Sequence, residues 1–109
     1  MQDRRRGQER RRTNRFQVEL DVEWENSTGR FPGALNDVNL DGCFVLSSGD
    51  VNDGEYVKIY VPAADGTKTA FAGRIANHVF DIGFGVKFDE LSALQRDILF
   101  QIVRDFEKS

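Results

Sequence analysis

The feature that most constrains this chain is an unbroken alternation of apolar and polar residues near its start. Five apolar residues alternate with five polar ones, in the order Phe16, Gln17, Val18, Glu19, Leu20, Asp21, Val22, Glu23, Trp24, Glu25. A period of two over ten residues indicates a β-strand with one buried face and one exposed face. Such a strand needs partners and a core to cover, so the sequence predicts a β-rich domain that begins at residue 16.

Shorter apolar segments separated by turn residues follow this strand. Their spacing predicts strands at about 30–35, 43–46, 56–61, 69–79 and 84–88. Asp65-Gly66 is a hairpin signal, and Gly73 inside the fifth strand is expected to mark a bulge.

The end of the chain follows a different pattern. Apolar residues recur every three or four positions from Leu91 to Phe106, which is typical of an amphipathic helix, and Ser92 with Gln95 resembles a capping box at its start. We therefore predict a mainly β fold, a six-stranded antiparallel barrel with a C-terminal α-helix.

Charge divides the chain into two unequal parts. Residues 1–15 hold seven arginines and carry a net charge of +5, whereas residues 16–109 carry −8. The first fifteen residues show no apolar periodicity, so we expect a flexible basic arm ahead of one folded domain, 16–109. A basic arm on an acidic body favours an anionic ligand for the arm and disfavours a broad nucleic-acid surface.

Composition argues against several function classes. Cys43 is the single cysteine and His78 the single histidine, which disfavours an intramolecular disulfide, a metal site and histidine-dependent catalysis. No segment approaches the roughly 20 apolar residues of a membrane span, and the polar start lacks a secretory h-region. We expect a cytoplasmic protein that is not an enzyme, needs no cofactor and does not insert into a membrane.

The arm carries an R-x-x-x-R spacing at Arg11 and Arg15, preceded by Arg10. A separation of four places two side chains on one side of a segment, whether it is helical or extended. The guanidinium group binds phosphate bidentately and also pairs with guanine O6 and N7, so the pair suits a phosphodiester joined to a purine. The alternative is an ordinary solvated basic tail.

A second candidate constellation is Asp37-x-Asn39-x-x-Gly42, which we expect in a loop that leads into the strand at 43–46. A carboxylate suits the N–H donors on the Watson–Crick edge of guanine, and an amide adds a donor and an acceptor. Glycine allows a positive φ or a close approach of ligand to backbone. The alternative is a turn whose Asp and Asn side chains cap their own backbone.

These motifs, taken in order, resemble a known family. Glu9, Arg10, Arg11 and Arg15 precede the alternating strand, D-x-N-x-x-G follows at Asp37–Gly42, and G-x-G-V-x-F follows at Gly83–Phe88 before the closing helix. This order is similar to that of PilZ domains, the bacterial receptor modules for cyclic di-GMP. The resemblance extends from about Glu9 to Phe106.

The resemblance implies a set of site residues. Arg11 and Arg15 would bind the phosphates and guanines, and Asp37, Asn39 and Gly42 would complete the guanine site. The sequence departs from the family pattern at Asn39, where serine is usual. Arg10 occupies the position that in this family accompanies an intercalated ligand dimer, which implies two ligands per chain.

Three functions remain to be distinguished. The first is a cyclic di-GMP receptor whose arm changes conformation on binding and which signals to a downstream effector protein, in the family's settings of motility, pilus or exopolysaccharide control. The second is a PilZ-like adaptor that binds proteins but no nucleotide. The third is a nucleic-acid binder, which the acidic body disfavours.

Overall fold

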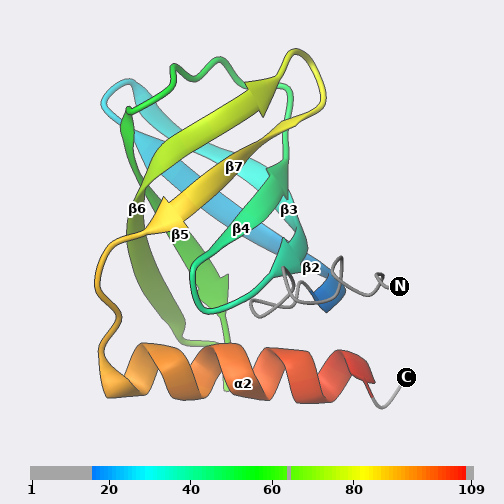
Figure 1. The fold of residues 1–109 in the computed structure, drawn as a ribbon. Helices are drawn as coiled ribbons and strands as arrows, with labels where there is room; N and C mark the ends of the chain where they lie inside the picture. Colours follow the sequence, from blue (N-terminus) through cyan, green and yellow to red (C-terminus); the bar gives the residue numbers. More distant parts are fainter. Residues whose placement is uncertain (1–15, 64, 108–109) are drawn as a thin grey trace, which may run out of the picture.

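The computed structural model describes residues 16–63 and 65–107, as six strands and one helix (Figure 1). The elements are β2 (Phe16–Asn26), β3 (Gly29–Val38), β4 (Gly42–Leu46), β5 (Tyr56–Pro62), β6 (Lys68–Val79), β7 (Gly83–Phe88) and α2 (Ala93–Glu107). The strands form a closed antiparallel barrel in the order β2-β3-β4-β7-β6-β5, with β5 returning to β2. Helix α2 crosses one end of the barrel, and the turn between β6 and β7 lies at the other end. The predicted barrel with a C-terminal helix is confirmed.

The core fills the barrel with the inward residues that the alternation predicts. Val18, Val22 and Trp24 are buried, and the Trp24 ring packs 4.8 Å from Phe31 and 4.9 Å from Phe84, centroid to centroid. The indole Nε1 donates a hydrogen bond to Ser47 Oγ at 3.1 Å, so this buried polar group is satisfied. No charged or polar side chain is fully buried among the described residues.

Helix α2 begins with the capping box that the sequence predicts. The Ser92 Oγ accepts a hydrogen bond from the Gln95 backbone nitrogen at 3.1 Å, and Gln95 Oε1 accepts one from the Ser92 nitrogen at 2.8 Å. The Gln95 side chain also donates to the Ala70 carbonyl of β6 at 2.9 Å, which ties the start of the helix to the barrel. Leu99 and Ile102 on the inner face of the helix are buried against the barrel core.

Two details of the strands differ from the sequence prediction. Strand β3 continues through Val38, so Asp37 lies in a strand and not in the loop; its backbone pairs with β2 and β4. The bulge expected at Gly73 is at Ala76 instead, where the register of β6 against β7 shifts between Ile75 and Asn77. Gly73 has another reason to be glycine, because a Cβ there would overlap the carbonyl oxygen of Lys87.

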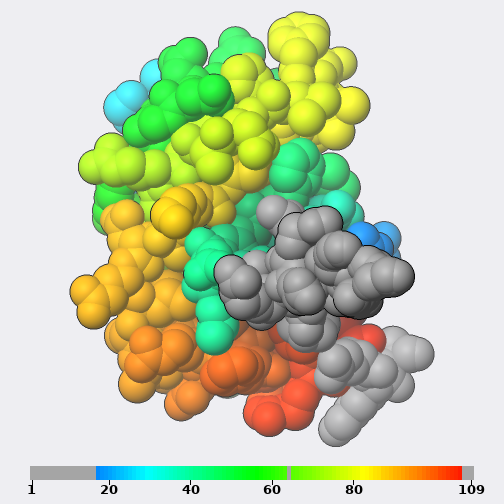
Figure 2. Space-filling view, in the orientation of Figure 1, coloured from blue at the N-terminus to red at the C-terminus, as the bar shows by residue number. Residues whose placement is uncertain are grey.

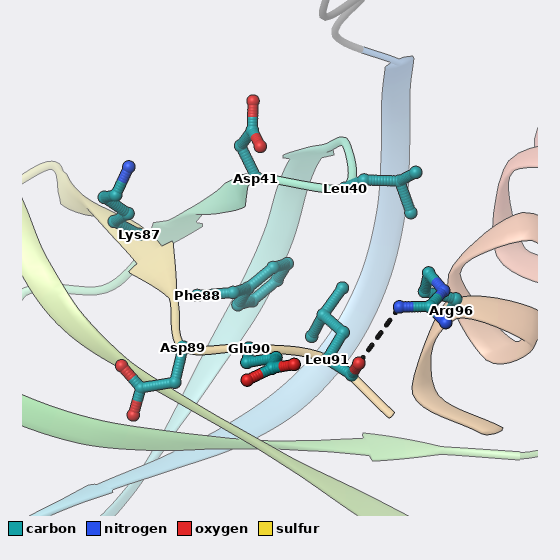
Figure 3. Close-up of a pocket in the computed structure, with 8 residues that line it drawn as sticks. All are labelled: Leu40, Asp41, Lys87, Phe88, Asp89, Glu90, Leu91 and Arg96. Carbon is teal, nitrogen blue, oxygen red and sulfur yellow. Dashed lines mark hydrogen bonds between the residues drawn. The ribbon is translucent and has the colours of Figure 1, made fainter. Parts of the chain in front are cut away.

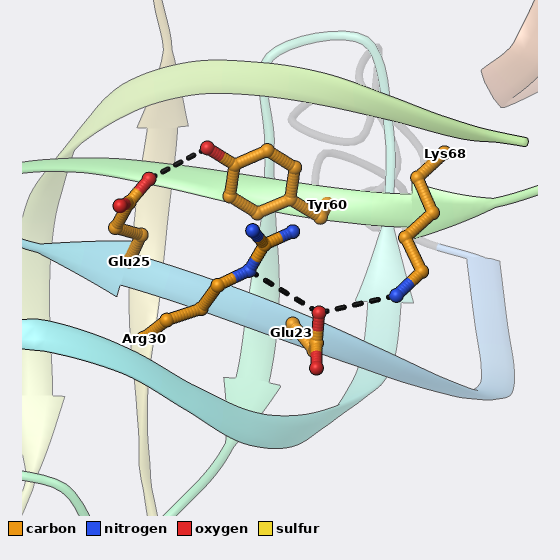
Figure 4. A network of polar contacts seen from close by, with 5 residues as sticks. All are labelled: Glu23, Glu25, Arg30, Tyr60 and Lys68. Carbon is orange, nitrogen blue, oxygen red and sulfur yellow. Dashed lines mark hydrogen bonds and ion pairs between the residues drawn. The ribbon is translucent and has the colours of Figure 1, made fainter.

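A polar network joins four strands on the outer face of the barrel (Figure 4). Glu23 accepts from Arg30 and Lys68, each at 3.2 Å, and these two contacts, Lys68 first, hold the pKa of Glu23 below its ordinary value. The Arg30 guanidinium lies 3.8 Å from the centroid of the Tyr60 ring, and the Tyr60 hydroxyl donates to Glu25 Oε1 at 2.6 Å. That hydrogen bond is the main cause of the raised pKa of Tyr60. Every cation of the network has an acidic or aromatic partner, so the cluster links strands and leaves no vacant site for an anion.

Candidate functional site

The loop between β3 and β4 is closed by Asn39. Its side-chain Oδ1 accepts hydrogen bonds from the backbone nitrogens of Asp41 at 2.7 Å and Gly42 at 3.0 Å. Its own backbone nitrogen donates to the Gly42 carbonyl at 2.9 Å. The self-capping role that the sequence left open is therefore present, and it fixes the shape of the loop.

Gly42 is required by close packing of the backbone and not by a positive φ. The described glycines with positive φ are Gly29, Gly54 and Gly66, and Gly42 is not one of them. A Cβ at Gly42 would overlap the carbonyl oxygen of Val86 in β7. The glycine thus lets β4 begin directly against β7, which brings the 39–42 loop onto the outer face of that strand.

The pairing registers align a row of outer residues across five strands. Gln17 of β2 is opposite Asp37, Asp37 is opposite Phe44, Phe44 is opposite Gly85, and Gly85 is opposite Asn77 of β6. Neighbouring strands lie about 4.8 Å apart, so this row extends across the face that carries the 39–42 loop. Asp37 and Asn77 are separated in the row by an aromatic residue and a glycine.

A shallow hollow of about 220 Å³ lies at the loop end of this face. Its lining combines the loop with the outer surfaces of β6 and β7: Asn39, Asp41, Gly42, Cys43, Ala76, Asn77, Gly85, Val86 and Lys87. Gly85 has no side chain, and Asn77 lies over it: a Cβ at Gly85 would be 3.0 Å from Asn77 Oδ1. Asn77 is exposed, so its amide is available at the surface of the hollow.

A second hollow of about 300 Å³ lies on the other side of the loop (Figure 3). It is lined by Leu40, Asp41, Lys87, Phe88, Asp89, Glu90, Leu91 and Arg96. Arg96 of α2 donates to the Leu91 carbonyl at 3.1 Å, as the close-up shows. Asp41 and Lys87 line both hollows, and Lys87 forms no ion pair with another described residue. Lys87 is therefore a cation available to an anionic ligand on either side of the loop.

The structure brings some of the predicted site residues together and leaves others aside. Asn39 and Gly42 line the first hollow, whereas Asp37 does not line it and lies in the outer row beside it. Asp37 already takes part in an interaction within the protein. The remaining predicted site residues, Arg10, Arg11 and Arg15, lie outside the described residues.

Sequence reasoning missed Asn77, Lys87 and Arg96. Asn77 and Lys87 are far from the D-x-N-x-x-G motif in sequence, and only the pairing of β6 with β7 and of β7 with β4 brings them to it. The one available signal was the G-x-G-V-x-F segment, which contains Lys87 and whose glycines indicate an outer face approached closely by other groups.

The described residues also limit what else the domain holds. No group of three or more His, Cys, Asp or Glu side chains in residues 16–63 and 65–107 could hold a metal ion. No helix in this part of the chain is long and apolar enough to span a membrane.

In the described residues, the closed barrel with helix α2 across its end defines a small β-barrel domain of known architecture. A model of the PilZ domain matches residues 9–105. The chain therefore belongs to the PilZ domain family, as its motifs predicted. A search of curated proteins finds no match.

Two solved structures illustrate the shared fold. The PilZ domain of CeSA, from a cellulose-synthesizing bacterium, is 20% identical with a TM-score of 0.67; the match covers 87% of this chain and 99% of that one. The Bacillus subtilis inhibitor of motility, MotI/DgrA, is 17% identical with a TM-score of 0.70, covering 92% of this chain and 53% of that protein. At these identities the comparison establishes the fold.

Proposed function

We propose that this domain is a cyclic di-GMP receptor that signals to a downstream effector protein. The observation that carries the proposal is the position of the D-x-N-x-x-G loop, this chain's form of the family's loop motif. Asn39 and Gly42 form one wall of a hollow whose other wall, Asn77 and Lys87, supplies an amide and a cation that has no ion-pair partner among the described residues. These groups match a ligand made of guanines, which have donors and acceptors on their edges, and phosphates, which are anionic.

In this proposal the basic arm completes the site. Arg11 and Arg15 hold the phosphates and guanines, and Arg10 supports a second ligand molecule. Ordering a free segment typically costs about 2–5 kcal/mol, and hydrogen bonds to charged groups contribute roughly 1.5–3 kcal/mol each, so two arginines can offset the cost. Binding would then change the position of the arm, which is the signal passed to the effector.

An adaptor that binds no nucleotide is the alternative. One observation favours it: Asn39 Oδ1 is already used by two backbone amides of its own loop, which leaves only the Nδ2 group for a ligand. In either case, that the domain catalyses no reaction stays a prediction.

Amide NMR of the ¹⁵N-labelled full chain tests the site. Titration with cyclic di-GMP should shift the amides of residues 39–42, Asn77 and Gly85 first, and cyclic di-AMP should not. Lys87→Gln should weaken binding by about tenfold or more, since it removes a charge-assisted contact. Lys58→Gln is the matched control, because Lys58 is an exposed lysine on β5, away from both hollows. Shifts confined to other strands, or equal loss in both variants, would overturn the proposed site.

A further inference from the structure

Four exposed apolar side chains gather at the end of the barrel opposite α2. They come from the β6–β7 turn and the end of β4, and we call them the hairpin patch: Leu46, Val79, Phe80 and Ile82. Phe80 is 80% exposed and Ile82 is 55% exposed. Single exposed apolar residues are common on protein surfaces, but a cluster of them often marks an interaction site. Leu46 is directly opposite Gly83 in the β4–β7 pairing, so the four residues are neighbours. Figure 2 shows this turn, in yellow, at the upper edge of the molecule.

The hairpin patch is held by a defined backbone. The Ile82 nitrogen donates to the Val79 carbonyl at 3.0 Å, and the Ser47 nitrogen donates to the Ile82 carbonyl at 3.0 Å. Asp81 has φ +64°, a conformation that aspartate tolerates better than most residues with side chains. Turn hydrogen bonds and the link to Ser47 therefore hold the backbone that carries Phe80 and Ile82, which lowers the backbone entropy lost when a partner binds.

The segments that adjoin the hairpin patch carry acidic side chains. The turn and the adjoining loop, residues 47–55, contain four acids and neither lysine nor arginine: Asp50, Asp53, Glu55 and Asp81. Two basic side chains of β6 contact this loop: His78 Nδ1 is 3.4 Å from Asp53 Oδ1, and Arg74 donates to the Gly54 carbonyl at 3.3 Å, at the end of the loop farther from the patch. A surface that fits this patch must therefore combine an apolar pocket with a rim of lysine or arginine.

Two other occupants fit less well. In a symmetric dimer through this patch, the same acids would face one another across the interface, which is unfavourable. An anionic membrane surface would be repelled by the same charges, since membrane-binding surfaces rely on lysine and arginine.

From the apolar exposure, the fixed turn and the acidic surround, we propose that the hairpin patch docks a partner protein through an apolar pocket rimmed by basic side chains. Phe80 is the central anchor, flanked by Ile82, as expected for interfaces in which one buried aromatic contributes most of the affinity.

The same strand that ends at the patch begins at the candidate ligand loop. Strand β4 starts at Gly42 and ends at Leu46, and the ring of its central residue, Phe44, lies over Gly83 at the base of the turn. A conformational change of the 39–42 loop would thus be passed to the hairpin patch along the five residues of β4. This coupling, unlike the docking itself, rests on the proposed receptor function.

In-cell photo-crosslinking of the full chain tests the docking without the nucleotide. A photo-crosslinking phenylalanine analogue replaces Phe80 and, in a matched control, Leu94, which is 64% exposed on α2. We expect a discrete adduct at position 80 and none at 94, mapped by mass spectrometry to an apolar pocket bordered by lysine or arginine. An adduct with a second copy of the chain, with lipid or with an acidic surface, or no adduct, would overturn the proposal.

The partner protein identified by crosslinking is then purified, and its affinity for variants of this chain measures the contribution of Phe80. Phe80→Ser should weaken binding by about tenfold or more, and Leu94→Ser should leave it unchanged. Asp81→Asn, which keeps a residue that tolerates the turn, should also weaken it, and added salt should shrink that difference. Equal effects of Phe80→Ser and Leu94→Ser would contradict the proposal. Phe80 lies in the β6–β7 turn, at the end of the barrel opposite α2 (Figure 1), and docking is measured without nucleotide. Cyclic di-GMP binding is therefore scored independently, and its failure leaves this result intact.

Discussion

The side-chain oxygen of Asn39 lies 3.0 Å from the backbone nitrogen of Gly42, and this contact closes the loop that joins β3 to β4. The residue that departs from the family's usual serine therefore has a structural role in the loop. A serine hydroxyl can accept hydrogen bonds from the same backbone nitrogens, so a serine at this position should keep the loop closed.

Removal of the Asn39 side chain should destabilise the domain modestly. Asn39→Ala leaves two backbone amides without their acceptor, and we expect a loss of about 1 kcal/mol in the free energy of unfolding, similar to the loss of a helix cap. Asn39→Ser should recover most of it. Urea denaturation measures the free energy of unfolding of the wild type and both variants. An alanine variant as stable as the wild type would show that solvent fully replaces the side-chain hydrogen bonds.

Substitution of Gly42 should be far more costly than substitution of a glycine in open space. In Gly42→Ala the new Cβ overlaps the Val86 carbonyl, so we expect a loss of about 3 kcal/mol, in the range of severe overpacking. Gly54→Ala is the control: its φ is +84° with nothing within 4 Å of the added Cβ, and it should cost about 1 kcal/mol. Thermal or chemical unfolding that ranks the two in the opposite order would refute the close approach of β4 to β7.

The start of α2 offers a test of the capping box. Ser92→Ala removes the acceptor of the Gln95 amide and should lower stability by about 1 kcal/mol. Ser92→Asp should retain the cap, because aspartate is also a favourable residue there. The midpoint of denaturant unfolding is measured for both variants. Equal midpoints for Ser92→Ala and Ser92→Asp would exclude a contribution from the cap.

The Glu23 network predicts that the free energy of unfolding decreases as the pH falls into the acidic range. Since contacts with Lys68 and Arg30 lower the folded pKa of Glu23, its stabilising effect is fully present above the unfolded pKa of glutamate. It is lost as the pH falls through the lower folded pKa.

Lys68→Met should raise the NMR titration midpoint of the Glu23 carboxyl toward its ordinary value. Lys58→Met removes an exposed lysine that is not among the contacts that lower the pKa of Glu23, and it should leave that midpoint in place. A midpoint unmoved by Lys68→Met would show that this contact does not persist in solution.

The sequence was sufficient for the parts of the fold that depend on local periodicity. The alternation around Val22 and Trp24 and the Ser92–Gln95 box both encode their structure within a few residues, and both predictions are confirmed. The bulge was misplaced because a glycine in a strand signals either a bulge or a close approach. Gly73 is the second case, which depends on Lys87 of a different strand.

The candidate site was only partly predictable for the same reason. Asn39 and Gly42 share one short motif, so their proximity follows from the sequence. Asn77 and Lys87 reach the same hollow through strand pairing between distant segments, which no local pattern records. The roles of Arg10, Arg11 and Arg15 stay predictions.

The central claim is that the domain is a cyclic di-GMP receptor whose arm arginines bind the ligand. Isothermal titration calorimetry of cyclic di-GMP into the wild-type chain and the Arg11→Ala/Arg15→Ala variant tests it most directly. We predict micromolar or tighter binding by the wild type and a loss of about a hundredfold or more in the variant, with a stoichiometry of two ligands per chain if Arg10 acts as proposed. No binding by a wild-type chain shown to be folded, or equal binding by both proteins, would contradict the claim.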